Sequence, residues 1–158
     1  MRLSAPHALA QAHRLEQFRC SAAELTSWLM ERAHQNQASG ASRCFVVCDA
    51  QHNVVGYYAL AAGGVSHQLV PGRLRRNMPH PIPVIVLCRL AVHADWVGQG
   101  VGAGLLKDAV QRTMQVCGHI GARALLCHAF DDTAKAFYLK HGFIASPMDG
   151  RTMMLPVA

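Results

Sequence analysis

Long apolar runs are absent from this chain of 158 residues. No run approaches the ~20 residues that a membrane-spanning helix needs, and the N-terminus lacks the apolar segment of a secretory signal. We therefore expect a cytoplasmic protein with no membrane association. Hydrophobic residues make up 51% of the chain and charged residues 15%, a balance that excludes disorder. The length is typical of one domain, spanning residues 1–158.

Metal and disulfide signatures are also missing. The chain has six cysteines and ten histidines, but no Cys-x-x-Cys pair and no helical His-x-x-x-His pair. A chain of this size needs no disulfide to be stable. We expect reduced cysteines that act as small core residues, and no bound metal.

Acidic residues are few: nine Asp and Glu stand against fifteen Lys and Arg, giving a net charge of +6. Twelve of the fifteen cations are arginine, whose planar fork matches phosphate oxygens. Three of them, Arg73, Arg75 and Arg76, lie in a long loop predicted for residues 63–83. Aromatic residues are only 6% and do not alternate with basic ones as on a base-stacking RNA sheet. The composition favours a partner that is recognised through its phosphates.

The most informative feature is a strand, a glycine turn and a helix in succession. The β-branched run Val84–Val92 predicts a buried strand, and the apolar spacing of Leu105–Cys117 predicts a helix. Between them, Gly98, Gly100 and Gly102 occupy every second position. Glycines allow backbone N–H groups to approach a ligand, and a helix N-terminus attracts anions. This segment therefore predicts a pyrophosphate site.

Two kinds of phosphate loop do not fit. No Gly-Lys is followed by a hydroxyl residue, which excludes a P-loop NTPase. A dinucleotide-binding fold needs an acid at the end of the next strand, where this chain has His128.

The remaining pattern is a mixture of helices and strands, an α+β fold. Ser21-Ala-Ala-Glu24 predicts a capping box that opens a helix with an apolar stripe at Leu25, Trp28, Leu29 and Ala33. Strands are predicted at Arg43–Cys48, Val54–Leu60, Ala122–Ala129, Phe143–Ala145 and Thr152–Leu155. Asp131–Gly142 predicts a short helix with acids at its start and cations at its end.

Two blocks of the sequence resemble the Gcn5-related N-acetyltransferase (GNAT) superfamily. They are Arg89-Leu-Ala-Val92 with Gly98-Gln-Gly-Val-Gly102, and Ala136-Phe-Tyr-Leu-Lys-His-Gly-Phe143. The resemblance implies a mostly antiparallel mixed sheet, splayed into a V between the fourth and fifth strands and flanked by helices. It also implies acetyl-CoA as cosubstrate. Val97 stands where the family has Arg or Gln.

The resemblance implies a role for individual residues. The pyrophosphate is expected on the loop Val97, Gly98, Gln99, Gly100, Val101 and Gly102. The pantetheine arm is expected beside Leu90, Ala91 and Val92, with an N–H near Val92 polarising the thioester carbonyl. Tyr138 matches the family's catalytic tyrosine, the general acid that protonates the departing thiolate.

Further segments are similar to bacterial toxin–antitoxin acetyltransferases, which acetylate the α-amino group of aminoacyl-tRNA and block translation. These segments are Phe18-Arg-Cys20, Asn36–Arg43, Val55-Gly-Tyr-Tyr58 and the arginine-rich loop. Arg19 and Ser21 depart from the family's Phe-Asp-Cys-Gly. The similarity implies a ribbon-helix-helix antitoxin and a homodimer.

Several acceptors and roles stay open. Arg73, Arg75, Arg76, Arg89 and Arg43 are candidates for contacts to tRNA, although Arg89 could instead be a paired structural arginine. No carboxylate stands out as a general base, which suits an α-amine of low pKa. The alternatives are a GNAT enzyme acting on a small-molecule amine or a protein N-terminus, and a non-enzymatic module that binds CoA or nucleic acid.

Overall fold

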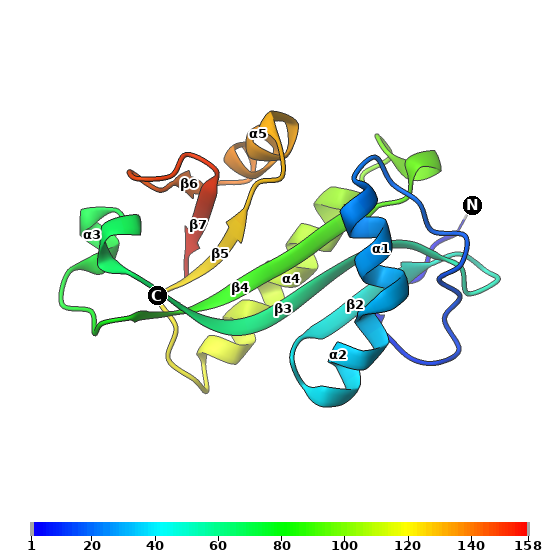
Figure 1. Ribbon diagram of the computed structural model, residues 1–158, viewed down its shortest axis with the longest axis horizontal. Coiled ribbons are helices and arrows are strands. Elements are labelled where there is room, and N and C mark those ends of the chain that lie inside the picture. Colours follow the sequence, from blue (N-terminus) through cyan, green and yellow to red (C-terminus); the bar gives the residue numbers. More distant parts are fainter. Residues whose placement is uncertain (1, 158) are drawn as a thin grey trace. The chain divides into compact units, whose positions relative to one another are not determined.

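A computed structural model describes residues 2–157 of the chain, and Figure 1 shows its helices and strands. The elements in chain order are β1 (His7–Ala8), α1 (Ala23–Glu31), α2 (Ala33–Ser39), β2 (Arg43–Cys48), β3 (Val54–Val65), α3 (Gly72–Arg75), β4 (Ile82–Val92), α4 (Val101–Cys117), β5 (Ala124–His128), α5 (Asp132–Lys140), β6 (Ile144–Ala145) and β7 (Thr152–Pro156). Short 3₁₀ turns cover His67–Leu69 and Ala94–Trp96.

The described strands form one sheet in the order β1-β2-β3-β4-β5-β7-β6. β4 and β5 run parallel, whereas β1–β2, β2–β3, β5–β7 and β6–β7 are antiparallel. The predicted mixed α and β fold with a mostly antiparallel sheet is therefore confirmed. No helix within residues 2–157 is both long and apolar enough to cross a membrane.

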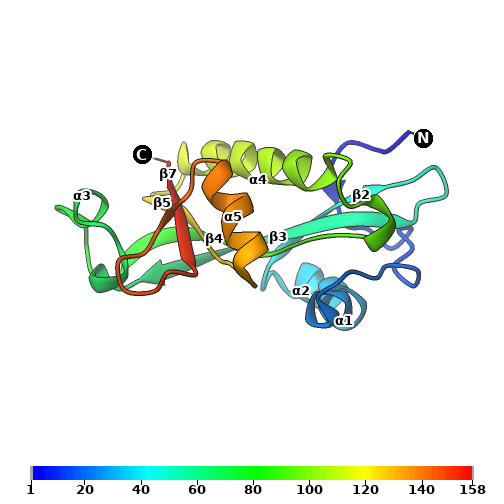
Figure 2. The same cartoon turned by 90° about the horizontal axis from the view of Figure 1, so that it is seen from above.

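The chain groups into two compact units. The first contains the chain up to Ala61 together with Cys88–Ala109. In this unit α1 and α2 lie on one face of the strands, and the first turns of α4 lie on the other (Figure 2). The predicted apolar stripe is buried as expected, because Leu29 and Ala33 are fully buried against β2 and β3. The single helix predicted for this stripe is wrong, since it is divided at Arg32 and Ala33 begins α2.

The predicted capping box is wrong. The N-cap of α1 is Ala22, and no side chain caps the helix. Instead the Thr26 hydroxyl, one turn inside α1, accepts a hydrogen bond from the backbone N–H of Cys20 at 3.0 Å. The incoming chain is therefore fixed from within the helix, and Ser21 lies outside the position that a cap requires.

The strand predicted at Val54–Leu60 extends further than expected. β3 runs to Val65, through Gly63 and Gly64, where the sequence predicted the beginning of a loop. A Cβ at Gly63 would lie 2.7 Å from Cγ2 of Val86, and one at Gly64 would lie 3.1 Å from Cγ of Pro81. These glycines allow close packing within the strand, so their presence does not end it. β4 likewise begins at Ile82, earlier than predicted.

The second unit contains Ala62–Leu87 and the chain from Val110 onward. Its core joins β-strand residues such as Val84, Leu126 and Met154 to Leu74 of α3. The register of β4 with β5 pairs Ile85–Leu87 with Leu125–Cys127 and ends there. The short helix predicted within Asp131–Gly142 is confirmed as α5; Asp131 caps it by accepting a hydrogen bond from the N–H of Ala134 at 2.8 Å, and Gly142, with φ +93°, follows it.

Candidate acetyl-donor and acceptor site

The glycine segment joins β4 to the long helix α4, as predicted. Gly98 and Gly100 have φ values of +83° and +84°, a conformation that side-chain-bearing residues rarely adopt. A Cβ built at either position meets no atom within 4 Å, so the space before this backbone is open. α4 begins at Val101, four residues before the predicted apolar run, so Gly102 belongs to its first turn. The exposed amides of this loop therefore lie at the N-terminus of a helix of 17 residues.

Val97 contributes no polar group to this loop. Its side chain is 67% exposed. The open backbone beside it, with two left-handed glycines and a helix start, fits a pyrophosphate without help from this side chain.

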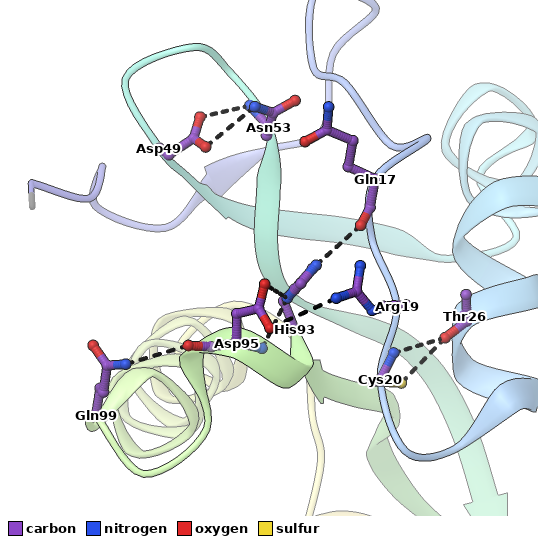
Figure 3. A network of polar contacts seen from close by, with 9 residues as sticks. All are labelled: Gln17, Arg19, Cys20, Thr26, Asp49, Asn53, His93, Asp95 and Gln99. Atoms are coloured by element: carbon purple, nitrogen blue, oxygen red, sulfur yellow. Dashed lines mark hydrogen bonds and ion pairs between the residues drawn. The ribbon is translucent and has the colours of Figure 1, made fainter.

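A network of polar contacts around His93 supports the turn that precedes this loop (Figure 3). The ring of His93 is buried, and its Nε2 donates to the carbonyl oxygen of Gln17 at 3.0 Å. Its Nδ1 accepts from the N–H of Asp95 at 3.0 Å. Both nitrogens are thus satisfied by the neutral ring. Sequence analysis missed this residue, whose partner Gln17 lies 76 positions away.

The segment Phe18–Ser21 takes part in the same network through Arg19. The N–H of Ala94 donates to the carbonyl oxygen of Arg19 at 2.9 Å, and the Arg19 guanidinium lies 3.7 Å from the Asp95 carboxylate. The ion pair is exposed and weak by itself. Together with His93, these contacts fix the turn that leads into the glycine loop.

Leu90, Ala91 and Val92 form the end of β4. Ala91 is buried in the core of the first unit, and its two neighbours are half-buried. All three follow Leu87, the last residue of β4 in the register with β5. Their position is the one at which the resemblance implies that a pantetheine arm is bound.

Arg89 lies on an aromatic stack. Its guanidinium carbon is 5.4 Å from the centre of the Trp28 ring, which is stacked on Tyr57 with planes 9° apart. Nη1 donates to the carbonyl oxygen of Cys88 at 2.8 Å. The buried Nε has no hydrogen-bond partner among the described residues, and no acidic side chain there forms an ion pair with Arg89. Both interpretations of Arg89, a contact to tRNA or a structural arginine, therefore stay predictions.

The other predicted arginines lie in different places. Arg43 is at the start of β2, where its Nη1 donates to the carbonyl oxygen of Gln37 at 2.7 Å and so braces α2. Arg73, Arg75 and Arg76 are exposed on and just after α3 in the second unit. The predicted irregular loop contains this short helix because Leu74 is buried and Arg123 Nε donates to the Leu74 carbonyl at 3.0 Å.

Tyr138 is buried in α5, with 7% of its surface exposed. Its ring contacts Phe137 and Phe143, and its hydroxyl forms a hydrogen bond with the thiol of Cys127. Burial, reinforced by Cys127, raises the pKa of Tyr138 well above its usual value. The phenol therefore retains its proton at physiological pH.

One group of possible metal ligands exists among the described residues. Ligand atoms of His7, His13 and Cys48 lie within 4.8 Å of one another. His13 Nδ1 accepts from the N–H of Ala10 at 2.9 Å, so its Nε2 carries the proton and donates to His7 Nε2 at 2.8 Å. Burial, with Asp49, raises the pKa of the Cys48 thiol to about 11. These atoms form a hydrogen-bonded pair of neutral rings beside a protonated thiol.

The mostly antiparallel sheet and the open glycine loop between β4 and α4 agree with the resemblance to N-acetyltransferases. The model of the acetyltransferase (GNAT) domain family matches residues 40–145. The chain is 47% identical over 152 residues to a tRNA-acetylating toxin of Mycobacterium tuberculosis, covering 96% of this chain and 91% of the relative. The chain therefore belongs to the GNAT acetyltransferase family and is an acetyl-CoA-dependent N-acetyltransferase.

Solved structures share the fold. AtaT complexed with acetyl-methionyl-tRNAfMet has a TM-score of 0.89 at 23% identity, covering 98% of this chain and 95% of that one. A tyrosine-to-phenylalanine mutant of the AtaT toxin, bound to the C-terminus of the antitoxin AtaR and acetyl-CoA, has a TM-score of 0.83 at 24% identity. The alignment covers 98% of this chain and 93% of that chain.

Proposed function

We propose that this enzyme acetylates the α-amino group of aminoacyl-tRNA and thereby blocks translation, as the toxin of a type II toxin–antitoxin pair. The observation that carries the proposal is the 47% identity to a tRNA-acetylating toxin along nearly the whole chain. The exposed arginines of α3 and the scarcity of acidic residues support an acceptor that carries phosphates.

The acetyl donor binds through the backbone. The exposed amides of Val97–Gly102 receive the pyrophosphate, which the left-handed glycines and the N-terminus of α4 favour. Leu90, Ala91 and Val92 lie along the pantetheine arm, and an N–H near Val92 polarises the carbonyl oxygen that becomes negative in the transition state. Acetyl-CoA supplies the thioester that makes the acetyl group transferable.

Tyr138 is the general acid. Its hydroxyl delivers a proton to the sulfur as the carbon–sulfur bond breaks. Binding of the donor replaces the thiol of Cys127 as the hydrogen-bond partner of the hydroxyl. The leaving thiolate of CoA is a stronger base than the neutral thiol of Cys127, so it accepts the proton of Tyr138 whereas Cys127 does not.

The acceptor is held by cations. Arg73, Arg75 and Arg76 contact phosphates of the tRNA acceptor end, and Arg89 uses its free donors on the same substrate. Arg43, whose guanidinium is already bonded to Gln37, contributes charge alone. Such contacts recognise the phosphate backbone of the tRNA and the esterified amino acid more than the base sequence.

The proposal extends to the assembly. The catalytic domain spans residues 1–158, and the protein forms a homodimer in the cytoplasm, where charged tRNA and acetyl-CoA are found. A ribbon-helix-helix antitoxin neutralises it. The solved complex of AtaT with the C-terminus of its antitoxin supports an antitoxin partner.

An acceptor assay tests the function. Purified enzyme is incubated with labelled acetyl-CoA and either bulk aminoacyl-tRNA, a polyamine or a peptide with a free N-terminus. We expect label on aminoacyl-tRNA alone. Label on the polyamine or peptide with none on tRNA would support a small-molecule or N-terminal acetyltransferase. No transfer to any acceptor, with acetyl-CoA still bound, would favour the non-enzymatic module.

A further inference from the structure

A chain of three polar side chains ends at the exposed imidazole of His128. His128 is the last residue of β5, and the strand register places it opposite Thr152 of β7. The Thr152 hydroxyl donates to Oδ2 of Asp149 at 2.9 Å. It has one proton to give, so at 3.0 Å from His128 Nδ1 it acts as the acceptor. His128 therefore carries its proton on Nδ1 and presents a lone pair on Nε2.

The two supporting residues are fixed in place. The side chain of Thr152 is buried, with 1% of the residue exposed. Asp149 Oδ1 also accepts from the N–H of Arg151 at 3.0 Å. These hydrogen bonds, that from Arg151 first, lower the pKa of the Asp149 carboxyl. An ionised carboxylate thus orients the hydroxyl, and the hydroxyl fixes the tautomer and direction of the imidazole.

The position of His128 on the strand separates it from Tyr138. β5 and β7 pair without a break from Ala124 to His128, so neighbouring side chains point to opposite faces. Cys127 bonds to the hydroxyl of Tyr138, and His128 lies on the other face. Leu126, on the same face as His128, packs in one cluster with Leu74 of α3. The imidazole thus shares its sheet face with the helix that carries the acceptor-binding arginines.

We propose that His128 is the proton acceptor for the attacking amine. The amine nitrogen forms a bond to the acetyl carbon as the carbon–sulfur bond breaks. The nitrogen gives its proton to Nε2 of His128, and the sulfur takes one from Tyr138. Even a neutral amine must lose a proton to become an amide, so an amine of low pKa does not remove the need for a base. The proposal deepens the proposed function and rests on it.

The first test replaces the imidazole. In His128→Gln we expect kcat for aminoacyl-tRNA to fall about 100-fold, within the range for loss of a general base, while both KM values stay within about threefold. His119→Gln, an exposed histidine outside β5, is the matched control and should retain wild-type kcat. A folded His128→Gln enzyme with wild-type kcat would overturn the proposal. So would a loss confined to the KM for tRNA, because that result makes His128 a binding residue.

Added imidazole separates proton transfer from support of the fold. In His128→Ala, free imidazole should restore kcat by at least about tenfold, because a soluble base replaces the missing one. Tyr138→Phe should gain nothing. Equal failure of imidazole in both variants contradicts the proposal. If His128→Ala does not fold, Thr152→Val provides the second variant: it preserves side-chain shape, and an unchanged kcat would show that the oriented imidazole is not used.

Failure of the proposed function gives a different result. If the wild-type enzyme acetylates a small amine and leaves aminoacyl-tRNA untouched, the tRNA assignment is wrong. The role of His128 is then measured with that amine by the same variants, since proton removal is common to every amine acceptor.

Discussion

The guanidinium of Arg89 lies over the indole of Trp28, with its central carbon 5.4 Å from the ring centre. This contact holds a cation without neutralising it, because an aromatic face attracts the positive charge but accepts few of its N–H donors. The side chain is thereby fixed in direction while donors remain for an anion.

We therefore predict that Arg89→Lys raises the KM for aminoacyl-tRNA about tenfold, since a lysine has neither the planar fork nor the same stacking. The Kd for acetyl-CoA should stay unchanged when measured by calorimetry. Arg43→Lys is the comparison, because the Arg43 side chain has a single hydrogen bond among the described residues, to the carbonyl oxygen of Gln37. Neither change alters the net charge, so an equal rise in KM in both variants would show that the place of Arg89 over Trp28 gives it no special role.

Tyr138→Phe should lower kcat about 100-fold or more, because a missing general acid leaves the thiolate unprotonated. Expression of this variant should no longer arrest growth, although acetyl-CoA should still bind. Tyr58→Phe removes another buried hydroxyl, the one bonded to Asp108, and serves as the control. The assignment of Tyr138 fails if the variant stays as toxic as the wild type.

A pair of charge reversals tests the arginine cluster. Arg75→Glu with Arg76→Glu should weaken binding to tRNA and reduce the slope of log affinity against log salt, since fewer counterions are released. Arg14→Glu with Arg32→Glu changes the net charge equally at exposed positions of the first unit. Fluorescence titrations at several salt concentrations measure both. Identical slopes in the two double variants would assign the effect to overall charge.

Gly98→Val or Gly100→Val should raise the Kd for acetyl-CoA by tenfold or more, because a β-branched residue is strained at positive φ and its side chain enters the open space before the amides. Gly121→Ala, at a glycine with open space and no positive φ, should bind normally. Calorimetry detects the difference. Normal binding by both valine variants would place the pyrophosphate elsewhere.

The histidine pair predicts an effect of pH on stability. Burial, then the charges of His7, His52 and His34, lowers the pKa of His13 below 6.5. The unfolded chain therefore binds a proton more readily than the folded one, so stability falls as the pH drops through 6.5 toward the lower folded value. Thermal unfolding at pH 7.5 and 5.5 should show a smaller difference in Tm for His13→Gln than for the wild type. An equal difference would contradict this assignment.

Local patterns predicted the parts of the fold that depend on neighbouring residues. β2 has the predicted bounds, and α5 has its acidic cap and closing glycine where the sequence places them. The glycine loop was found because its backbone geometry requires the residue type itself. In each case the determining contacts lie within a few positions along the chain.

Contacts between distant residues could not be predicted in this way. His93 depends on a carbonyl 76 residues away, and His128 is oriented by Thr152 from the next strand of the sheet. A histidine at a strand end has the same appearance in the sequence whether it is solvated or oriented. The extension of β3 was missed for a related reason, since Gly63 is required by its neighbour Val86, and no local pattern records that contact.

The buried environments of the cysteines also determine whether these thiols can react with acetyl-CoA. Burial raises the pKa of Cys44 and Cys127 to about 12, and Cys127 contacts the hydroxyl of Tyr138. Thiolates, and not thiols, exchange acyl groups with thioesters. A cysteine kept protonated next to a reactive acetyl donor cannot intercept the acetyl group, so the enzyme avoids inactivating itself while it waits for its acceptor.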